Sequence, residues 1–529
     1  MTRPGVCRPT ALLLAVGAVT LLLNPIPTVA GADSETLKSY NVDLRETTVS
    51  GVSSGAYMAV QFGVAHSAIV QGVGATAGGP YLCAFDRVPS LRGAIGTALA
   101  RCMQGDPDFP RQAITPTQMN RMARMTDAWA RSGRIDATSN LARQRIWLFH
   151  GYNDGLVKAA VTDALYDYYG RYIDPSRIFY KDNLNAAHAQ ITVDCGAGDA
   201  ACNLCPRTGG NFLNLCRDPA ADDTPYDAAG SMLQLFYGAL KPDDPTSVPG
   251  GKIVRFAQSE FALDGRGSAS PLRISMAEDG YVYVPDSCAR GEPCRVHVAF
   301  HGCGQSAAQI GSVFYEHAGY NRWADENRLI VLYPQTQPSQ PTALAPLLPL
   351  NPKACWDWWG YNDGLNQRGR FATQTGLQIA AVRRMLDRLA GKHSGVAPQP
   401  EPAGEFGPPS ALVVGDFTHR QVALRWNAVN GAVGYNVYRS ASAGGPFGRS
   451  QRINARPVDL ALYVDTGLRP RTRYFYVVRA VNQSNRESGD SAEVPALTAA
   501  TPPPCDPFFS FRLGTPVTRN NKPTEAVCR

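Results

Sequence analysis

Short apolar runs alternate with stretches of helical spacing between residues 31 and 392. Runs rich in β-branched and aromatic residues predict strands at 145–151, 177–182, 281–285, 295–302 and 329–335. Two stretches, 161–173 and 375–391, place apolar residues three and four positions apart, which predicts helices. This alternation predicts one large α/β domain, spanning residues 31–392, with a mostly parallel sheet.

The pattern changes beyond that domain. Residues 393–407 are rich in Pro and Gly and lack periodicity, which predicts a linker. Short alternating strands follow within 408–500 and predict a second, all-β domain; they lie at 421–429, 434–440 and 473–482. The last segment, 501–529, is too short to bury a core. It could display Phe508, Phe509 and Phe511 to a surface, or form a partly disordered tail.

The first 30 residues have the pattern of a secretory signal peptide. Arg3 and Arg8 form a basic start, an apolar run of about thirteen residues follows, and small residues precede Gly31. The apolar run is too short to span a membrane comfortably, and no later segment is long and apolar enough to do so. We therefore expect a secreted, extracellular protein with no membrane partner.

Charge argues against nucleic acid as a partner. The formal net charge of +7 falls to +5 without the signal, because Arg3 and Arg8 are the only charged residues among its 30. This mild excess is not gathered into a basic stripe.

Cysteine usage fits export. Thirteen cysteines are present, and removal of Cys7 with the signal leaves twelve, which allows up to six disulfides. Proximity in sequence predicts Cys83–Cys102, Cys288–Cys294 and Cys505–Cys528. A further cluster could bind zinc, although an exported context favours disulfides of open pairing; its members are Cys195, Cys202, Cys205 and Cys216.

A nucleophile is indicated by the stretch Gly51-Val52-Ser53-Ser54-Gly55, which matches G-x-S-x-G. In an α/β-hydrolase this motif forms a sharp turn between a strand and a helix, with the serine at its tip. The flanking sequence fits a short strand before the motif and a helix of small residues after it. Because a serine hydroxyl needs a base and an orienting carboxylate, two partners must be found for Ser53.

Both partners follow predicted strands. Asp154 comes just after the strand at 145–151, where open α/β sheets place functional groups, although it could also be a simple turn residue. His188 lies in a loop of small residues after the strand at 177–182, downstream of the acid. Serine, acid and histidine then follow the chain order of α/β-hydrolases, which His66, His150 and His301 fit less well.

The remaining part of such a site lies far downstream. Residues 296–306 read as a buried strand that runs into the Gly-rich loop at Cys303, and loops of this kind offer backbone N–H groups to an oxyanion. This strand normally precedes the nucleophile, but here it follows it by about 250 residues. Circular permutation explains the order, because the ends of a compact domain usually lie close together. The expected fold class is α/β: a circularly permuted α/β-hydrolase domain followed by an all-β sandwich.

The motifs together resemble the extracellular poly(3-hydroxybutyrate) depolymerases with a permuted catalytic domain. The segments that carry the resemblance lie between about 40 and 392: GVSSGAYMA, HGYNDGLV, AAH, FHGCGQS and CWDWWGY. The resemblance implies a triad of Ser53, Asp154 and His188, with the Cys303 and Ser54 amides as the oxyanion hole. It also implies a polyester substrate and no metal or cofactor. Such enzymes usually end in a larger polymer-binding domain, so adsorption to solid polymer is in doubt here.

The second domain resembles a fibronectin type III module over about 408–500. Residues 467–482 carry the resemblance, with Tyr474 as a tyrosine corner and Trp426 as the core tryptophan. The resemblance implies a spacing role for this module.

Three tryptophans lie within four positions at 356–359. Aromatic faces exposed at a cleft would bind an apolar polyester chain, and we expect Trp356 to be the one in the cleft. The alternative is packing behind the cleft, against a disulfide between Cys355 and Cys303.

Two other functions remain open from the sequence. An esterase for feruloyl or acetyl groups of plant cell walls shares this fold and a similar HGCGQ loop. A non-catalytic polymer-binding protein would use the all-β module and the aromatic tail, but the intact serine, acid and histidine set argues against it. We expect the protein to be a monomer.

Overall fold

The computed structural model describes residues 35–85, 91–105, 114–241, 250–263, 271–343, 345–346, 348–363, 369–391 and 406–501. The residues from Glu35 onward form one compact unit. The expected signal peptide, most of the linker, the Cys505–Cys528 pair and the aromatic tail lie outside the described residues.

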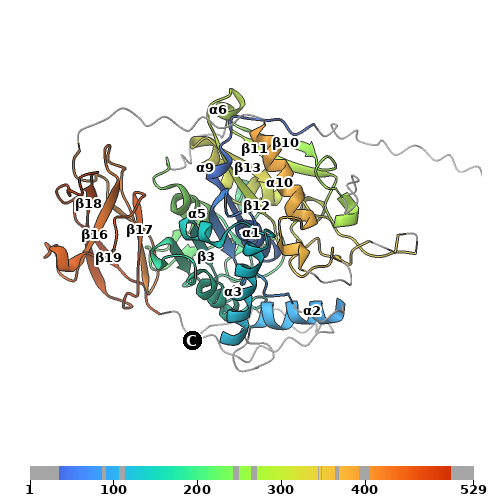
Figure 1. Cartoon of the computed structure of the whole chain (residues 1–529), viewed down its shortest axis with the longest axis horizontal. Helices are drawn as coiled ribbons and strands as arrows, with labels where there is room; N and C mark the ends of the chain where they lie inside the picture. Colours follow the sequence, from blue (N-terminus) through green and yellow to red (C-terminus); the bar gives the residue numbers. More distant parts are fainter. Residues whose placement is uncertain are drawn as a thin grey trace, which may run out of the picture. The chain divides into compact units, whose positions relative to one another are not determined.

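An eight-stranded sheet forms the centre of the first domain (Figure 1). Its order is β10-β11-β13-β12-β1-β2-β3-β4, and only β10–β11 and β11–β13 pair antiparallel. The mostly parallel sheet predicted from the alternating pattern is therefore confirmed. The strands are β1 Thr47–Val52, β2 Val70–Thr76, β3 Arg145–Phe149, β4 Ile178–Lys181, β10 Lys252–Ala257, β11 Asp279–Val284, β12 Arg295–Phe300 and β13 Leu329–Tyr333.

The sheet order confirms the permutation. Strands β1 to β4 precede His188 in the chain and form one half of the sheet, and β10 to β13 follow it and form the other half. The halves join where β1 pairs in parallel with β12, so that Thr48 faces His297. The strand that carries the nucleophile motif and the strand that leads to Cys303 are thus direct neighbours.

Helices cover both faces of the sheet. The hydrophobic cluster on one face includes residues of α1 Ser54–Ala65, α3 Pro116–Arg131, α4 Ala159–Tyr169 and α10 Leu377–Ala390. The cluster on the other face includes residues of α5 Ala228–Tyr237, α8 Val313–His317 and α9 Tyr320–Glu326. Helix α1 is buried along its whole length, because it packs across β1 and β2. The predicted helices at 161–173 and 375–391 correspond to α4 and α10. The shorter helices are α2 Leu91–Leu99, α6 Asp286–Ala289 and α7 Ala307–Ile310.

Disulfides hold the loops. The pairs Cys83–Cys102 and Cys288–Cys294 form as expected from sequence proximity. The four clustered cysteines form Cys195–Cys202 and Cys205–Cys216, so the zinc alternative is wrong. These two bridges lie in an excursion of short strands between β4 and α5: β5 Gln190–Ile191, β6 Asn203–Leu204, β7 Leu213–Leu215, β8 Arg217–Asp218 and β9 Thr224–Pro225.

The second domain is a β-sandwich of two antiparallel three-stranded sheets, β14-β15-β17 and β16-β18-β19. Its strands are β14 Val413–Phe417, β15 Gln421–Arg425, β16 Gly434–Ser440, β17 Leu462–Thr466, β18 Arg473–Val481 and β19 Val494–Leu497. Trp426 is buried in its core, with its ring edge-on to Tyr435. The Tyr474 hydroxyl accepts a hydrogen bond of 3.1 Å from the Arg469 amide, which is the expected tyrosine corner.

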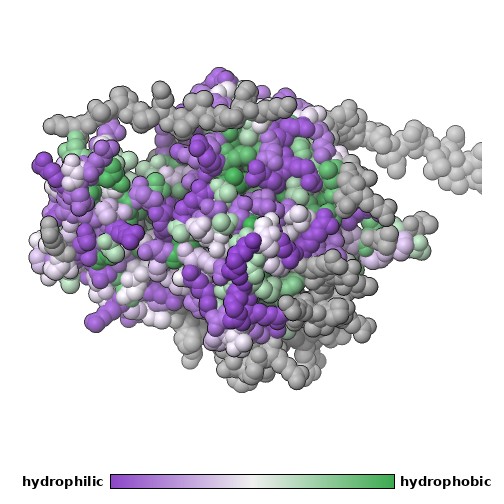
Figure 2. All heavy atoms as spheres, viewed as in Figure 1, coloured by the Kyte–Doolittle hydropathy of each residue, from purple (hydrophilic) through white to green (hydrophobic). Residues whose placement is uncertain are grey.

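The face of the molecule seen in Figure 2 is mixed, with hydrophobic residues scattered among hydrophilic ones. Within the described ranges, no helix is both long and apolar enough to cross a membrane.

A buried histidine lies where the two halves of the sheet join. His297 on β12 contacts two hydroxyls of β1: Nδ1 is 2.8 Å from Thr48 Oγ1 and Nε2 is 2.7 Å from Ser50 Oγ. Burial lowers the pKa of His297 to about 3. The folded state therefore holds this imidazole neutral over most of the acid range.

This burial predicts a loss of stability in acid. Below about pH 6.5 the unfolded chain binds a proton at His297. The folded chain binds a proton there only below about pH 3. Falling pH therefore favours unfolding, by about 1.4 kcal/mol per pH unit from this residue. Urea unfolding at pH 6.5, 5.5 and 4.5 should show a pH dependence that is shallower by that amount in His297→Gln. Parallel pH profiles for the two proteins would contradict the prediction.

Candidate active site

The nucleophile motif forms the turn between β1 and α1. Ser53 sits at the tip with φ 56° and ψ −120°, a conformation that non-glycine residues rarely adopt. Its amide donates to Thr76 O at 2.9 Å, and its side chain is only half-buried. Backbone strain of this kind, about 1–3 kcal/mol, persists where the surroundings hold it and is typical of a nucleophile elbow.

The two glycines of the motif are required by close packing. A Cβ at Gly51 would collide with the backbone of Gly55, and one at Gly55 would collide with the carbonyl oxygens of Phe300 and His301. The elbow is therefore pressed against the end of β12. This contact places Ser53 beside the loop that contains Cys303.

Asp154 and His188 form a buried pair. His188 Nδ1 lies 2.7 Å from Asp154 Oδ2, and both residues are about 5% exposed. The other carboxylate oxygen of Asp154 accepts from the amides of Leu156 and Val157 at 2.8 and 3.0 Å. The carboxylate is thus fixed on both sides, and it fixes the imidazole in turn.

The charge state of Asp154 suits this arrangement. Burial raises its pKa, but the charge of His188 and the hydrogen bond from it outweigh burial and hold the pKa below the usual value. The Asp154 carboxylate is therefore ionised at neutral pH. It can stabilise an imidazolium when His188 takes up a proton.

The remaining candidate contact is between serine and histidine. Among the described residues, the hydrogen bonds of His188 include none to Ser53. Such contacts are often long in the absence of substrate and tighten in the reacting complex. The structure thus joins the acid to the histidine and places the serine at the elbow.

The other histidines at strand ends are used structurally. His150 Nε2 lies 2.8 Å from Val157 O. His301 donates from Nδ1 to Gly302 O at 2.8 Å and accepts from the Thr336 amide at 3.2 Å, while burial lowers its pKa to about 4. Neither ring nitrogen of His301 is available as a base.

The loop after β12 leaves one amide unused. Gly302 N–H donates to Gln305 Oε1, Gly304 N–H to Lys353 O and Gln305 N–H to Gly302 O. Between them, the Cys303 amide has no acceptor among the described residues. The Ser54 amide opens α1, where helical N–H groups also lack an intrahelical partner. These are the two amides that we expect from the sequence as oxyanion donors, and both can take such a role.

Gln305 braces this loop, which the sequence did not reveal. Its Oε1 accepts from Gly302 at 2.7 Å, and its Nε2 donates to the carbonyls of Asn211 and Phe212 at 3.2 and 3.0 Å. The Cys303–Cys355 disulfide ties the same loop to the tryptophan segment, as the alternative reading of that segment expected.

We expect Gln305→Ala to lower kcat about 10- to 100-fold with little change in KM. Loss of the brace lets the Cys303 amide move, and one oxyanion donor is worth up to about 10²–10³ in kcat. Steady-state kinetics on a soluble short-chain ester measures this split. An unchanged kcat, or a rise confined to KM, would show that the brace does not act on the transition state.

The expectation for Trp356 is wrong. Its side chain is fully buried, with its ring 5.0 Å from Phe300 and 5.5 Å from His301 between ring centroids. It therefore supports the end of β12 and has no surface left for substrate. Trp358 is also buried and stacks on Tyr57 of α1 at 4.1 Å, whereas Trp359 is partly exposed.

Comparison with known proteins places this chain in a family. The chain is 35% identical over 459 residues to the poly(3-hydroxybutyrate) depolymerase of Delftia acidovorans, which covers 86% of this chain and 80% of the relative. It is 33% identical over 393 residues to the polyhydroxybutyrate depolymerase of Talaromyces funiculosus, covering 73% of this chain and 98% of the relative. No model of a known protein family matches the chain.

Two solved structures of depolymerases are also similar to this chain. They are the PHB depolymerase from Penicillium funiculosum and a PHB depolymerase complexed with an R3HB trimer. Each is 33% identical, with a TM-score of 0.54, and covers 67% of this chain and 98% of its own. With this identity over most of the chain and this shared fold, the protein belongs to the poly(3-hydroxybutyrate) depolymerases, a family of carboxylic ester hydrolases.

Proposed function

We propose that this protein is a secreted serine esterase that hydrolyses polyhydroxybutyrate through an acyl-enzyme. The observation that carries the proposal is the fixed Asp154–His188 pair at 2.7 Å, together with Ser53 on a strained elbow beside an unused amide. These are the three chemical requirements of the Ser-His-Asp mechanism: a nucleophile, an oriented base and donors for an oxyanion.

Acylation begins at Ser53. Its Oγ attacks the ester carbonyl carbon while His188 Nε2 takes the hydroxyl proton, and the Asp154 carboxylate holds Nδ1–H and stabilises the imidazolium. The tetrahedral intermediate then collapses, the bond to the alcohol oxygen breaks, and His188 gives its proton to that oxygen. The products of acylation are an acyl-Ser53 ester and a shortened polymer with a free hydroxyl end.

Deacylation repeats the cycle with water. His188 takes a proton from water as the oxygen attacks the acyl carbon, and it returns the proton to Ser53 Oγ when the acyl bond breaks. In both halves the negative oxygen accepts from the Cys303 and Ser54 amides, each worth roughly 3–4 kcal/mol. The positive end of α1 adds to this stabilisation.

The substrate assignment rests on the family. One solved relative is complexed with a trimer of R3HB, which shows that a site of this family accepts the oligomer. The five disulfides of the described residues support export to an oxidising compartment.

Hydrolysis of three soluble esters tests the proposal: the (R)-3-hydroxybutyrate trimer, methyl ferulate and acetylated xylan. We expect kcat/KM to be highest for the trimer, with 3-hydroxybutyrate among the products. Preference for either plant cell-wall ester would keep the serine chemistry and overturn the polyester assignment.

A further inference from the structure

The β-sandwich covers an edge of the catalytic sheet. Strand β4 ends the sheet and would leave a row of unpaired backbone groups, which is a site for unwanted strand pairing. Gln421 of β15 occupies this edge with its side chain. Its Oε1 accepts from the Tyr180 amide at 2.8 Å, and its Nε2 donates to Ile178 O at 3.1 Å. The amide side chain thus makes the two bonds that a neighbouring strand would make.

Strand β4 also carries a fully buried lysine. Lys181 Nζ lies 2.5 Å from Asp218 of the catalytic domain, 3.1 Å from Asp416 and 3.0 Å from Phe417 O of the sandwich. Its side chain has no exposed surface. Burial lowers the pKa of Lys181, but Asp416 and Asp218 outweigh it and raise the pKa. The ammonium therefore stays charged, and two of its three acceptors come from the sandwich.

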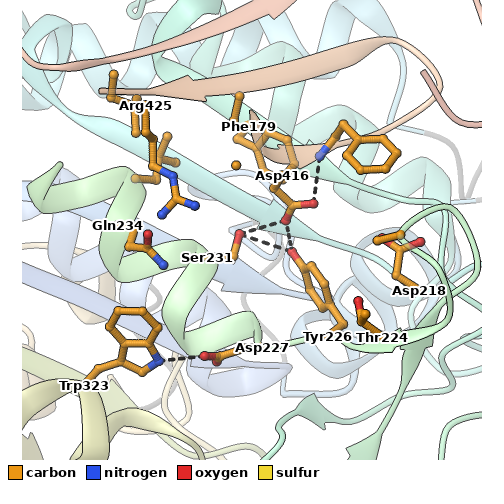
Figure 3. Close-up of a pocket in the computed structure, with 16 residues that line it drawn as sticks. Phe179, Asp218, Thr224, Tyr226, Asp227, Ser231, Gln234, Trp323, Asp416 and Arg425 are labelled. Atoms are coloured by element: carbon orange, nitrogen blue, oxygen red, sulfur yellow. Dashed lines mark hydrogen bonds between the residues drawn. The ribbon is translucent and has the colours of Figure 1, made fainter. Parts of the chain in front are cut away.

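Asp416 is held from the catalytic domain on its other side as well. Figure 3 shows its carboxylate facing Ser231 and Tyr226, and its Oδ2 accepts from Ser231 Oγ at 2.8 Å and from the Tyr226 hydroxyl. Three side chains of the catalytic domain thus converge on one carboxylate of the sandwich. If the Asp416 carboxylate moved away, the buried Lys181 would keep only one charged partner, Asp218.

Apolar packing and outer ion pairs surround these contacts. Ala423, Leu462 and Val464 of the sandwich belong to the buried cluster that includes Trp147 and Phe179 of the catalytic sheet. At the margin further ion pairs cross between the domains, among them Arg177 with both oxygens of Asp459 at 2.8 and 2.9 Å, and Arg420 with Asp182 at 2.9 Å. Exposed pairs of this kind contribute little energy but help to fix orientation.

We propose that the sandwich is a docked partner of the catalytic domain, which closes the β4 edge and folds with it as one cooperative unit. This differs from the spacing role that the module's resemblance implied. The proposal does not depend on the catalytic mechanism, since the interface lies on the β4 edge and its test needs no substrate.

Cutting the chain between the domains tests docking directly. A protease site is introduced into the full-length chain between residues 391 and 406, the purified protein is cleaved, and the fragments are followed by size-exclusion chromatography. Docked domains elute together after cleavage, whereas a domain that serves as a spacer elutes separately. Separation of the fragments in the otherwise unchanged protein would overturn the proposal.

Substitution of Asp416 tests which contacts hold the domains. Asp416→Asn should release the cleaved sandwich and lower the melting temperature of the uncleaved chain by about 5 °C, because one partner of a buried charge is lost. Asp490→Asn is the matched control, since Asp490 is partly exposed and pairs with Arg479 inside the sandwich. Gln421→Ala is a second, milder variant should Asp416→Asn fail to fold. If either interface variant behaves like Asp490→Asn, these contacts do not hold the domains and the proposal fails.

Discussion

Replacement of Ser53 by Ala should lower kcat for ester hydrolysis by about 10⁶-fold while the fold stays intact. Loss of a triad serine in an enzyme of this kind has an effect of this size, because no other group can form the acyl intermediate. Ser53 is only half-buried at the turn tip, so removal of its hydroxyl leaves no cavity in the core. Single-turnover and steady-state assays on a soluble ester measure the loss, and thermal unfolding checks the fold.

The neighbouring serine supplies the matched control. The Ser54 hydroxyl is buried and has no hydrogen-bond partner among the described residues, and only its backbone amide has a proposed role. Ser54→Ala keeps that amide and should therefore retain kcat within a few fold. Loss of activity in both variants to the same extent would mean that the serine pair, rather than the Ser53 nucleophile, is needed for structure.

Replacement of Asp154 by Asn should lower kcat about 10⁴-fold. The asparagine oxygen can still accept from the Leu156 and Val157 amides, so the loop around it is retained. Its NH₂ group would instead face His188 Nδ1, which favours the tautomer with the proton on Nε2, and that nitrogen can then no longer accept from Ser53. The variant also loses the charge that stabilises the imidazolium.

The matched control for Asp154→Asn is Asp174→Asn, at an exposed carboxylate that caps a short turn before β4. We expect it to retain full activity in the same kcat and KM measurements. An Asp154→Asn enzyme within tenfold of the wild type would remove Asp154 from the proposed triad.

The sequence predicted where the candidate site residues lie, because the ends of strands can be recognised in it. Ser53, Asp154 and His188 each follow an apolar run that forms a strand, and parallel strands bring their carboxyl ends to one edge of the sheet. The permuted order was predictable because the strand before Cys303 normally precedes the nucleophile in the chain, whereas here it follows it.

Other features depend on three-dimensional contacts that no local pattern contains. Trp356 and Trp359 are tryptophans of the same short segment, so the sequence does not distinguish them. Packing against Phe300 is what buries Trp356. The brace by Gln305 depends on carbonyls almost one hundred residues away at Asn211 and Phe212. Contacts between the sandwich and β4 likewise join positions more than two hundred residues apart.

Ser53 is the nucleophile that we propose for the cleavage of polyhydroxybutyrate by this protein. The most direct measurement is the clearing of a turbid suspension of polyhydroxybutyrate granules by the purified full-length protein, beside Ser53→Ala. We expect clearing by the wild type alone, with release of 3-hydroxybutyrate or its oligomers. Clearing by both proteins, or by neither in a preparation that hydrolyses soluble esters, would contradict this proposal.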